Sequence, residues 1–176
     1  MSFMKYLIVV FILFLTANFA FAQKSEYAIS GRNSRLIVKH KGKAHALRLD
    51  SDKIDAAKIT GTEILFANRQ GAFTYLLIDV VGDSKEKSDD RQCGAGVESN
   101  LIWIKLDAAW KIVESASERY ESCWSGITSQ DGYRIDGNLL TIEFDNFRDD
   151  VTVKLSYNAG EPEKGFQKQS AALKNQ

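Results

Sequence analysis

Short apolar runs recur along most of this chain, and they constrain its fold more than any other feature. Between Tyr27 and Tyr157 the runs are rich in β-branched and aromatic residues and end at Gly, Asn or Asp. Runs of this length, separated by turn residues, are typical of the strands of an all-β protein. The chain has a single proline, Pro162, so few strands are interrupted by a residue that cannot donate a backbone hydrogen bond. We therefore predict an antiparallel hairpin meander with little helix, arranged as a small barrel, a sandwich or a propeller-like sheet.

The pattern predicts ten strands within one domain over residues 23–157. They are Tyr27–Ser30, Arg35–His40, Ala44–Leu49, Glu63–Ala67, Phe73–Val81, Asn100–Leu106, Trp110–Tyr120, Tyr133–Asp136, Leu139–Phe144 and Val151–Tyr157. Between them, Ser51 to Ile59 is predicted as a short helix and Asp83 to Arg91 as a charged loop. Residues 158–176 are polar and are predicted to form a flexible C-terminal tail.

Turn residues predict the register of the first and last hairpins. Gly42-Lys43 fits a type II′ turn, which places His40 opposite His45 and puts both on one face with the apolar residues Leu36, Val38 and Leu47. In the last hairpin, Asp136-Gly137-Asn138 supplies a tight turn. Leu140, Ile142 and Phe144 then point inward from the strand that follows.

The two cysteines, Cys93 and Cys123, flank the middle hairpin. A turn centred on Ala108 pairs Leu106 with Trp110, and the same register continued outward brings Cys93 opposite Cys123. In an oxidising compartment we expect these thiols to form a disulfide, which would stabilise the fold by about 3–4 kcal/mol.

Residues Met1 to Ala22 have the pattern of an export signal. Lys5 supplies a basic start, Tyr6 to Thr16 form an apolar run, and Ala20-Phe21-Ala22 is an A-x-A cleavage site. The pattern predicts a periplasmic or secreted protein without a stable membrane span after cleavage. The alternative is an uncleaved N-terminal anchor, because the uncharged stretch is just long enough to span a bilayer.

The charge balance disfavours partners that are recognised by bulk charge. The chain has 23 basic and 23 acidic residues, and its basic residues are scattered. Nucleic acids and anionic lipid surfaces attract strongly basic proteins, so we do not expect either as a partner.

His40 and His45 are the only histidines, and the predicted register makes them cross-strand neighbours. Two imidazoles at that spacing supply half of a zinc or copper site. No adjacent carboxylate or thiol supplies a further ligand, so the alternative is that both histidines border the apolar face near an exposed turn. A small-molecule or metal site on this hairpin is the first alternative function.

Glu98 and Trp124 are the other candidate binding residues. Glu98 ends the segment Cys93-Gly94-Ala95-Gly96-Val97-Glu98, which could present backbone N–H groups to an anion or simply turn the chain into the next strand. Trp124 follows Cys123 and suits either an anchor in a protein interface or a cover over the disulfide.

Nothing in the sequence singles out a catalytic group. It contains no G-x-S-x-G motif, and Asp89-Asp90 and Asp149-Asp150 fit solvated loop charge. We assign no catalytic residue, no metal ligand and no cofactor. The expected function is non-enzymatic binding of a protein partner in the cell envelope, as an inhibitor or immunity-type protein. A hydrolase acting on envelope polymers is the second alternative.

Overall fold

The structure is a computed structural model that describes residues 26–32, 35–48, 58–84 and 96–173. Over these ranges it consists almost entirely of antiparallel strands and contains no α-helix, so the predicted all-β class is confirmed. Each of the ten predicted strands corresponds to one of the strands β1 to β10. The elements are β1 (Tyr27–Arg32), β2 (Arg35–His40), β3 (Lys43–Arg48), β4 (Lys58–Gln70), β5 (Phe73–Asp83), β6 (Val97–Leu106), β7 (Ile112–Ser122), β8 (Ile127–Asp136), β9 (Leu139–Asn146), β10 (Val151–Asn158), the 3-10 helix η3 (Pro162–Lys164) and β11 (Phe166–Ala172).

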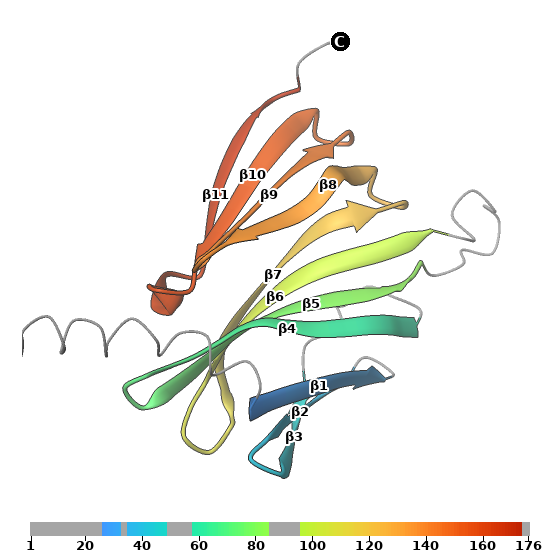
Figure 1. The fold of residues 1–176 in the computed structure, drawn as a ribbon. Helices are drawn as coiled ribbons and strands as arrows, with labels where there is room; N and C mark the ends of the chain where they lie inside the picture. The colour runs from blue at the N-terminus through green and yellow to red at the C-terminus, as the bar shows by residue number, and fades with distance from the viewer. Residues whose placement is uncertain (1–25, 33–34, 49–57, 85–95, 174–176) are drawn as a thin grey trace, which may run out of the picture.

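The strands form two sheets, and both are meanders. The small sheet has the order β1-β2-β3, and the large sheet has the order β11-β10-β9-β8-β7-β6-β5-β4, so each strand pairs with its neighbour along the chain. The small sheet lies beside β4 at one end of the molecule, while β8 to β11 rise away from it at the other (Figure 1). β7 and β8 share a single register pair, Ser122 with Ile127, so the large sheet is weakly joined there.

The two faces of β5 and β6 contribute to two different cores. Leu76 and Ile78 face the small sheet and pack in a cluster that includes Leu36, Val38 and Leu47. Leu77 and Trp103 face the other way, into a second cluster that also contains side chains of β9 and β10. The run from Leu101 to Ile104 is at most 2 % exposed. The run is therefore buried on both faces of the sheet, as its apolar residues at successive positions require.

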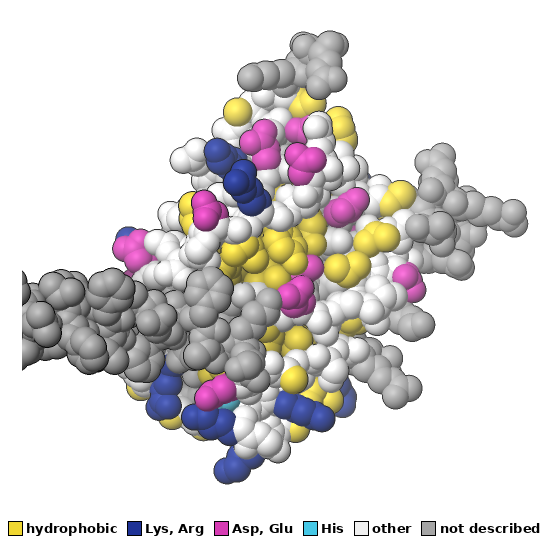
Figure 2. All heavy atoms as spheres, in the orientation of Figure 1, with side chains coloured by type: hydrophobic (Ala, Val, Ile, Leu, Met, Phe, Trp, Pro, Cys, Tyr) yellow, Lys and Arg dark blue, Asp and Glu magenta, His cyan; other side chains and the backbone are white. Residues whose placement is uncertain are grey.

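The large sheet curls around the second core, and the β10–β11 connection closes one end of the curl. Trp103 Nε1 donates a hydrogen bond of 2.9 Å to the carbonyl of Pro162, and Asn68 Nδ2 donates one of 3.0 Å to the carbonyl of Ala159. Lys168 on β11 forms an ion pair of 2.9 Å with Glu118 on β7. Figure 2 shows hydrophobic side chains gathered at the centre of this face of the molecule, with acidic side chains around them.

The segment predicted as a flexible tail, 158–176, instead contributes η3 and β11 to the fold. β11 pairs with β10 along its whole length, from Tyr157 with Phe166 to Val151 with Ala172. It is an edge strand with all side chains after Phe166 exposed. An edge strand of this kind has no buried face, so its sequence lacks the apolar alternation that identified the other strands.

The register predicted for the first hairpin is wrong by two residues. His40 pairs with Lys43 and Val38 with His45, because the turn residues are Lys41 and Gly42, with φ of 49° and 78°. Two successive residues with positive φ are the mark of a type I′ turn. A shift by two residues leaves every side chain on its predicted face, so both histidines remain beside the apolar residues.

The register predicted for the middle hairpin is also wrong. Leu106 pairs with Ile112 instead of Trp110, and Glu98 pairs with Ser122, because the turn is longer than expected and two bulges interrupt the ladder. Cys123 follows β7 directly, whereas Cys93 lies outside the described residues, so their pairing stays a prediction.

Several other predictions fall outside the described residues. These are the export signal over 1–22, all but the last two residues of the expected helix at Ser51 to Ile59, and most of the charged loop from Asp83 to Arg91. Within the part of the chain that the structure describes, we find no helix with the length and apolar character needed to cross a membrane.

Candidate functional site

His40 and His45 belong to a cluster of four rings at the turn end of the small sheet. His45 stacks on Trp110 with ring centroids 4.0 Å apart, and Tyr27 stacks on His40 at 4.5 Å. His40 in turn lies 5.3 Å from Trp110. The indole comes from the β6–β7 turn of the large sheet, so the ring cluster joins the two sheets.

The local backbone holds Trp110 in an unusual conformation. Asp107 Oδ1 accepts hydrogen bonds of 2.9 Å from the backbone N–H groups of Ala109 and Lys111, which closes the turn around Trp110. Trp110 adopts φ of 63°, in the left-handed region that bulky residues rarely occupy. Strain of this kind persists only where the surroundings fix the residue, and here the stacked rings do so.

The two imidazoles differ in electrostatic environment. His40 Nε2 lies 3.5 Å from Glu26 Oε2, and the same carboxylate oxygen lies 3.7 Å from Lys41 Nζ. Desolvation lowers the pKa of His45, and the positive charges of His40 and Lys43 lower it further. Among the described residues no three His, Cys, Asp or Glu side chains are grouped to hold a metal ion, so the structure does not supply the further ligand that a metal site requires.

Glu98 lies at the opposite end of β6 from the ring cluster and is 1 % exposed. Its Oε1 accepts a hydrogen bond of 2.8 Å from Ser84 Oγ, and its Oε2 lies 3.7 Å from Arg119 Nε. Arg119 also donates a hydrogen bond of 3.0 Å to Ser125, in the turn that carries Trp124. The structure therefore brings Glu98 close to the Trp124 turn, but as a buried partner of Arg119 rather than as a surface group.

The turn at 123–126 packs against the β9–β10 turn at 147–150. The backbone N–H of Phe147 donates to the carbonyl of Gly126 at 2.9 Å, and Arg148 donates to the carbonyl of Trp124 at 3.3 Å. Asn146 Oδ1 accepts from the backbone N–H groups of Arg148 and Asp149 and so orders the second turn. The Phe147 side chain is 59 % exposed despite this rigid backbone. We call these two turns the Phe147 surface.

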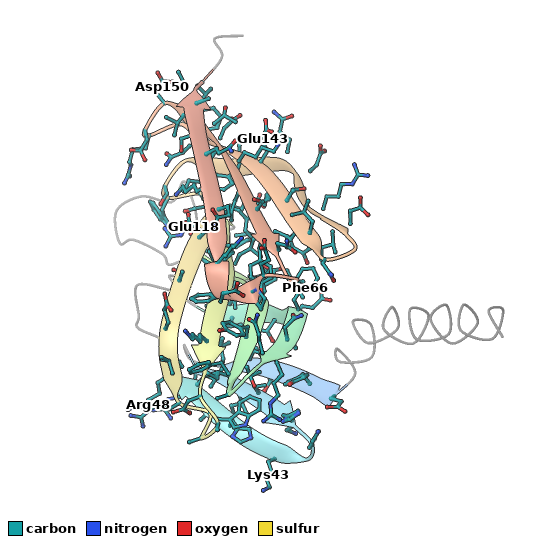
Figure 3. All side chains as sticks on the ribbon, turned by 90° about the vertical axis from the view of Figure 1, so that its left-hand side faces the viewer. Lys43, Arg48, Phe66, Glu118, Glu143 and Asp150 are labelled. Carbon is teal, nitrogen blue, oxygen red and sulfur yellow. The ribbon has the colours of Figure 1, made fainter. Side chains whose placement is uncertain are left out.

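A polar groove on the outer face of β8 to β11 adjoins the Phe147 surface. It consists of two hollows of about 430 and 1000 Å³, which share Gln130, Glu143, Asp145 and Lys154, and Phe147 lines the larger one. Glu143 lies on the outer face of β9, in the upper part of Figure 3. Asp145 Oδ1 accepts a hydrogen bond of 2.6 Å from Thr152, which fixes one wall. The lining carries charges of both signs.

A buried carboxyl group lies inside the second core. Asp79 Oδ1 accepts a hydrogen bond of 2.9 Å from the Tyr120 hydroxyl, and Asp79 is 9 % exposed. Burial raises the pKa of Asp79, and burial together with the Asp79 charge raises the pKa of Tyr120. Asp79 lines neither this groove nor a third hollow, which lies beside the ring cluster and is lined by Tyr27, His40 and Trp110. The combination of an open pocket and a carboxyl group of raised pKa, which the hydrolase alternative requires, is therefore not found at these hollows.

The four residues predicted as a site thus lie in two places. His40 and His45 contact Trp110 in the β6–β7 turn, whereas Glu98 and the Trp124 turn lie near each other at the other end of the β6–β7 hairpin, which Figure 1 shows as a long pair of strands. Phe147 is not among the residues predicted from the sequence. Its signal was present, because Phe147 is the one apolar side chain in the turn Asn146-Phe147-Arg148-Asp149-Asp150. Comparison with protein-family models, with curated proteins and with solved structures finds no match to this chain.

Proposed function

We propose that this chain is an exported, non-enzymatic binding protein that contacts a partner protein of the cell envelope through the Phe147 surface. The observation that carries the proposal is the 59 % exposure of Phe147 on a turn whose backbone is fixed by hydrogen bonds. An exposed aromatic side chain on a rigid backbone loses little conformational entropy when it is buried in a partner. An inhibitor or immunity-type role suits such a rigid surface.

The surroundings of Phe147 have the composition of a protein interface. Arginine and aromatic residues dominate the binding energy of such interfaces, and Trp124 and Arg148 flank Phe147. The adjoining groove offers hydrogen-bonding groups and charges of both signs, as the polar rim of an interface does. A protein partner can offer an apolar pocket for Phe147 together with polar groups and charges of both signs for the groove. A partner of uniform charge cannot.

Export and a disulfide between Cys93 and Cys123 are part of the same proposal. Cys123 directly follows Ser122, and Ser122 pairs with Glu98, which is five residues after Cys93 in the chain. Cys123 therefore lies at the end of the β6–β7 hairpin where β6 begins, four residues after Cys93 in the sequence, and the proposal pairs the two cysteines there. Free-thiol titration of the denatured, unreduced protein is expected to find no reactive sulfur, and two reactive thiols would contradict the pairing.

Site-specific photo-crosslinking tests the proposed surface. A benzophenone amino acid at position 147 is expected to capture one discrete partner from envelope extract, which mass spectrometry then identifies. The matched control is the same replacement at Val113, which is 53 % exposed and lies at the other end of β7. The variant with the photo-crosslinker at position 113 is not expected to capture the partner that the variant at position 147 captures.

Competition makes the result specific to the Phe147 side chain. Unlabelled wild-type protein is expected to abolish capture, and Phe147→Ala protein is expected to compete about thirtyfold more weakly, which corresponds to a hot-spot loss of about 2 kcal/mol. Equal competition by both proteins, or capture of the same species from position 113, would refute the proposal. A cross-linked product of two copies of this chain would also refute it in favour of self-association.

A further inference from the structure

A cavity of about 420 Å³ lies beside the ring cluster, between the small sheet and two turns of the large sheet. Tyr27 and His40 line it from the small sheet, Arg69 lines it from the end of β4, and Trp110 lines it from the β6–β7 turn. Cavities of this size hold small organic molecules and occur preferentially where structural units meet. The cavity lies at the opposite end of the molecule from the β9–β10 turn, as the positions of Lys43 and Asp150 in Figure 3 show.

The acceptor groups of the cavity already have donors. Glu26 lies within ion-pair distance of both Lys41 and His40. Asp107 accepts two backbone hydrogen bonds at one carboxylate oxygen. Both carboxylates are therefore already engaged with donors of the protein itself.

The donor groups, in contrast, are available. Within the described part of the chain, the Arg69 guanidinium, the Tyr27 hydroxyl and the Trp110 indole N–H form no hydrogen bond or ion pair. Arg69 lies close enough to Tyr27 to lower the pKa of its hydroxyl, although burial and Glu26 raise that pKa more strongly. Tyr27 is therefore a protonated donor at neutral pH. A cavity with free donors and occupied acceptors favours a ligand that brings acceptors.

We propose that this cavity binds a small carboxylic acid that carries a planar ring, with its carboxylate on Arg69 and its ring beside Tyr27, His40 and Trp110. A guanidinium binds a carboxylate through two parallel charge-assisted hydrogen bonds, which fixes the orientation of the ligand. The three rings give the apolar part of the ligand an aromatic wall, and the stacked histidines hold this wall in place.

Calorimetric titration with three probes tests the two halves of the proposal. Benzoate presents both the ring and the carboxylate, benzyl alcohol presents the ring without the charge, and inorganic phosphate presents an oxyanion without the ring. Benzoate is expected to bind at least about tenfold more tightly than either of the others. In an NMR titration the indole N–H signal of Trp110 is expected to shift on benzoate addition, while that of Trp124 stays in place.

Two arginine variants separate the site from bulk charge. Arg69→Gln is expected to weaken benzoate binding about ten- to a hundredfold, because it removes the charge-assisted pair. Arg48→Gln removes the same charge at the far end of β3 from Lys43 (Figure 3) and is expected to leave binding unchanged. Both residues are exposed, so neither change threatens the core.

Three results would overturn the proposal. They are no heat of binding with benzoate at about 10 mM, equal binding of phosphate and benzoate, and equal losses in the two arginine variants. Because this cavity and the Phe147 surface lie at opposite ends of the molecule, each of these outcomes leaves the protein-binding proposal intact, and the cross-linking result leaves this one intact.

Discussion

Replacing Trp103 with phenylalanine removes one buried hydrogen bond and part of a closely packed ring. Trp103 is 2 % exposed, and its Nε1 donates to the Pro162 carbonyl at 2.9 Å. Loss of the donor leaves the Pro162 carbonyl with one remaining hydrogen bond, from the backbone N–H of Gly165 at 3.3 Å, so the loss costs about 0.5–1.5 kcal/mol. The smaller ring adds a void of roughly 40 Å³, which costs about 1 kcal/mol at the usual cavity coefficient. We therefore expect Trp103→Phe to lower the free energy of unfolding by about 1.5–2.5 kcal/mol.

The location of the effect is as informative as its size. Trp103 lies on β6 and holds the connection that leads into β11, so the loss of this contact should loosen the C-terminal segment first. Urea unfolding followed by circular dichroism measures the overall loss. Hydrogen exchange is expected to accelerate over residues 159–172 more than in β1 to β3. A loss below about 0.5 kcal/mol with unchanged exchange over 159–172 would refute the reasoning, because Trp103 would then not anchor this segment.

Three further changes test separate features of the fold. Asp79→Asn is expected to raise the melting temperature at neutral pH and to leave it unchanged well below pH 3.8. Burial raises the pKa of Asp79 above its ordinary value of 3.8, so the ionised carboxylate destabilises the folded state as the pH rises above that value. A lower melting temperature at neutral pH would contradict this. Gly31→Ala should lower the free energy of unfolding in urea by about 1–3 kcal/mol, because the added methyl would meet side-chain carbons of β4 at 2.8 and 2.9 Å. The control is Gly61→Ala, whose methyl would meet β5 at an ordinary 3.6 Å and should cost nothing. Equal losses in both variants would rule out the steric cause. Lys168→Gln should lower the free energy of unfolding by less than about 1 kcal/mol, because Lys168 and its partner Glu118 are both partly exposed. This loss should vanish in high salt, which screens exposed charges. A larger or salt-independent loss would contradict the assignment of the pair as an ordinary surface ion pair.

Strand positions could be read from the sequence because one or both faces of most strands are buried. In β9 and β10 the apolar residues alternate, and Leu140, Ile142, Val153 and Leu155 are all buried as that alternation predicts. Hairpin registers were less accessible. They depend on backbone angles at one or two residues, such as Lys41, and on bulges that no side-chain pattern marks. β11 escaped detection because it has no buried face to leave a pattern.

The candidate sites were predicted only in part, for a related reason. The alternation of side chains along the two strands of one hairpin predicted that His40 and His45 lie on the same face. Their contact with Trp110 depends on how the small sheet packs against a turn far along the chain, which local periodicity cannot convey. Glu98 was predicted as a site residue because a glycine-rich segment precedes it in the sequence. Its ion-pair partner, Arg119, lies on the neighbouring strand and could not be identified from that segment.

The pairing order of the large sheet has a consequence for how its length can change. Because every strand bonds only to its neighbours along the chain, a whole hairpin can be inserted or deleted without reversing the direction of any other strand. The junction of β7 and β8, with its single register pair, is where such a change would break the fewest hydrogen bonds. In terms of strand pairing, the sheet can therefore lengthen in steps of two strands beyond β7 while the pairing of β5 with β6 stays unchanged.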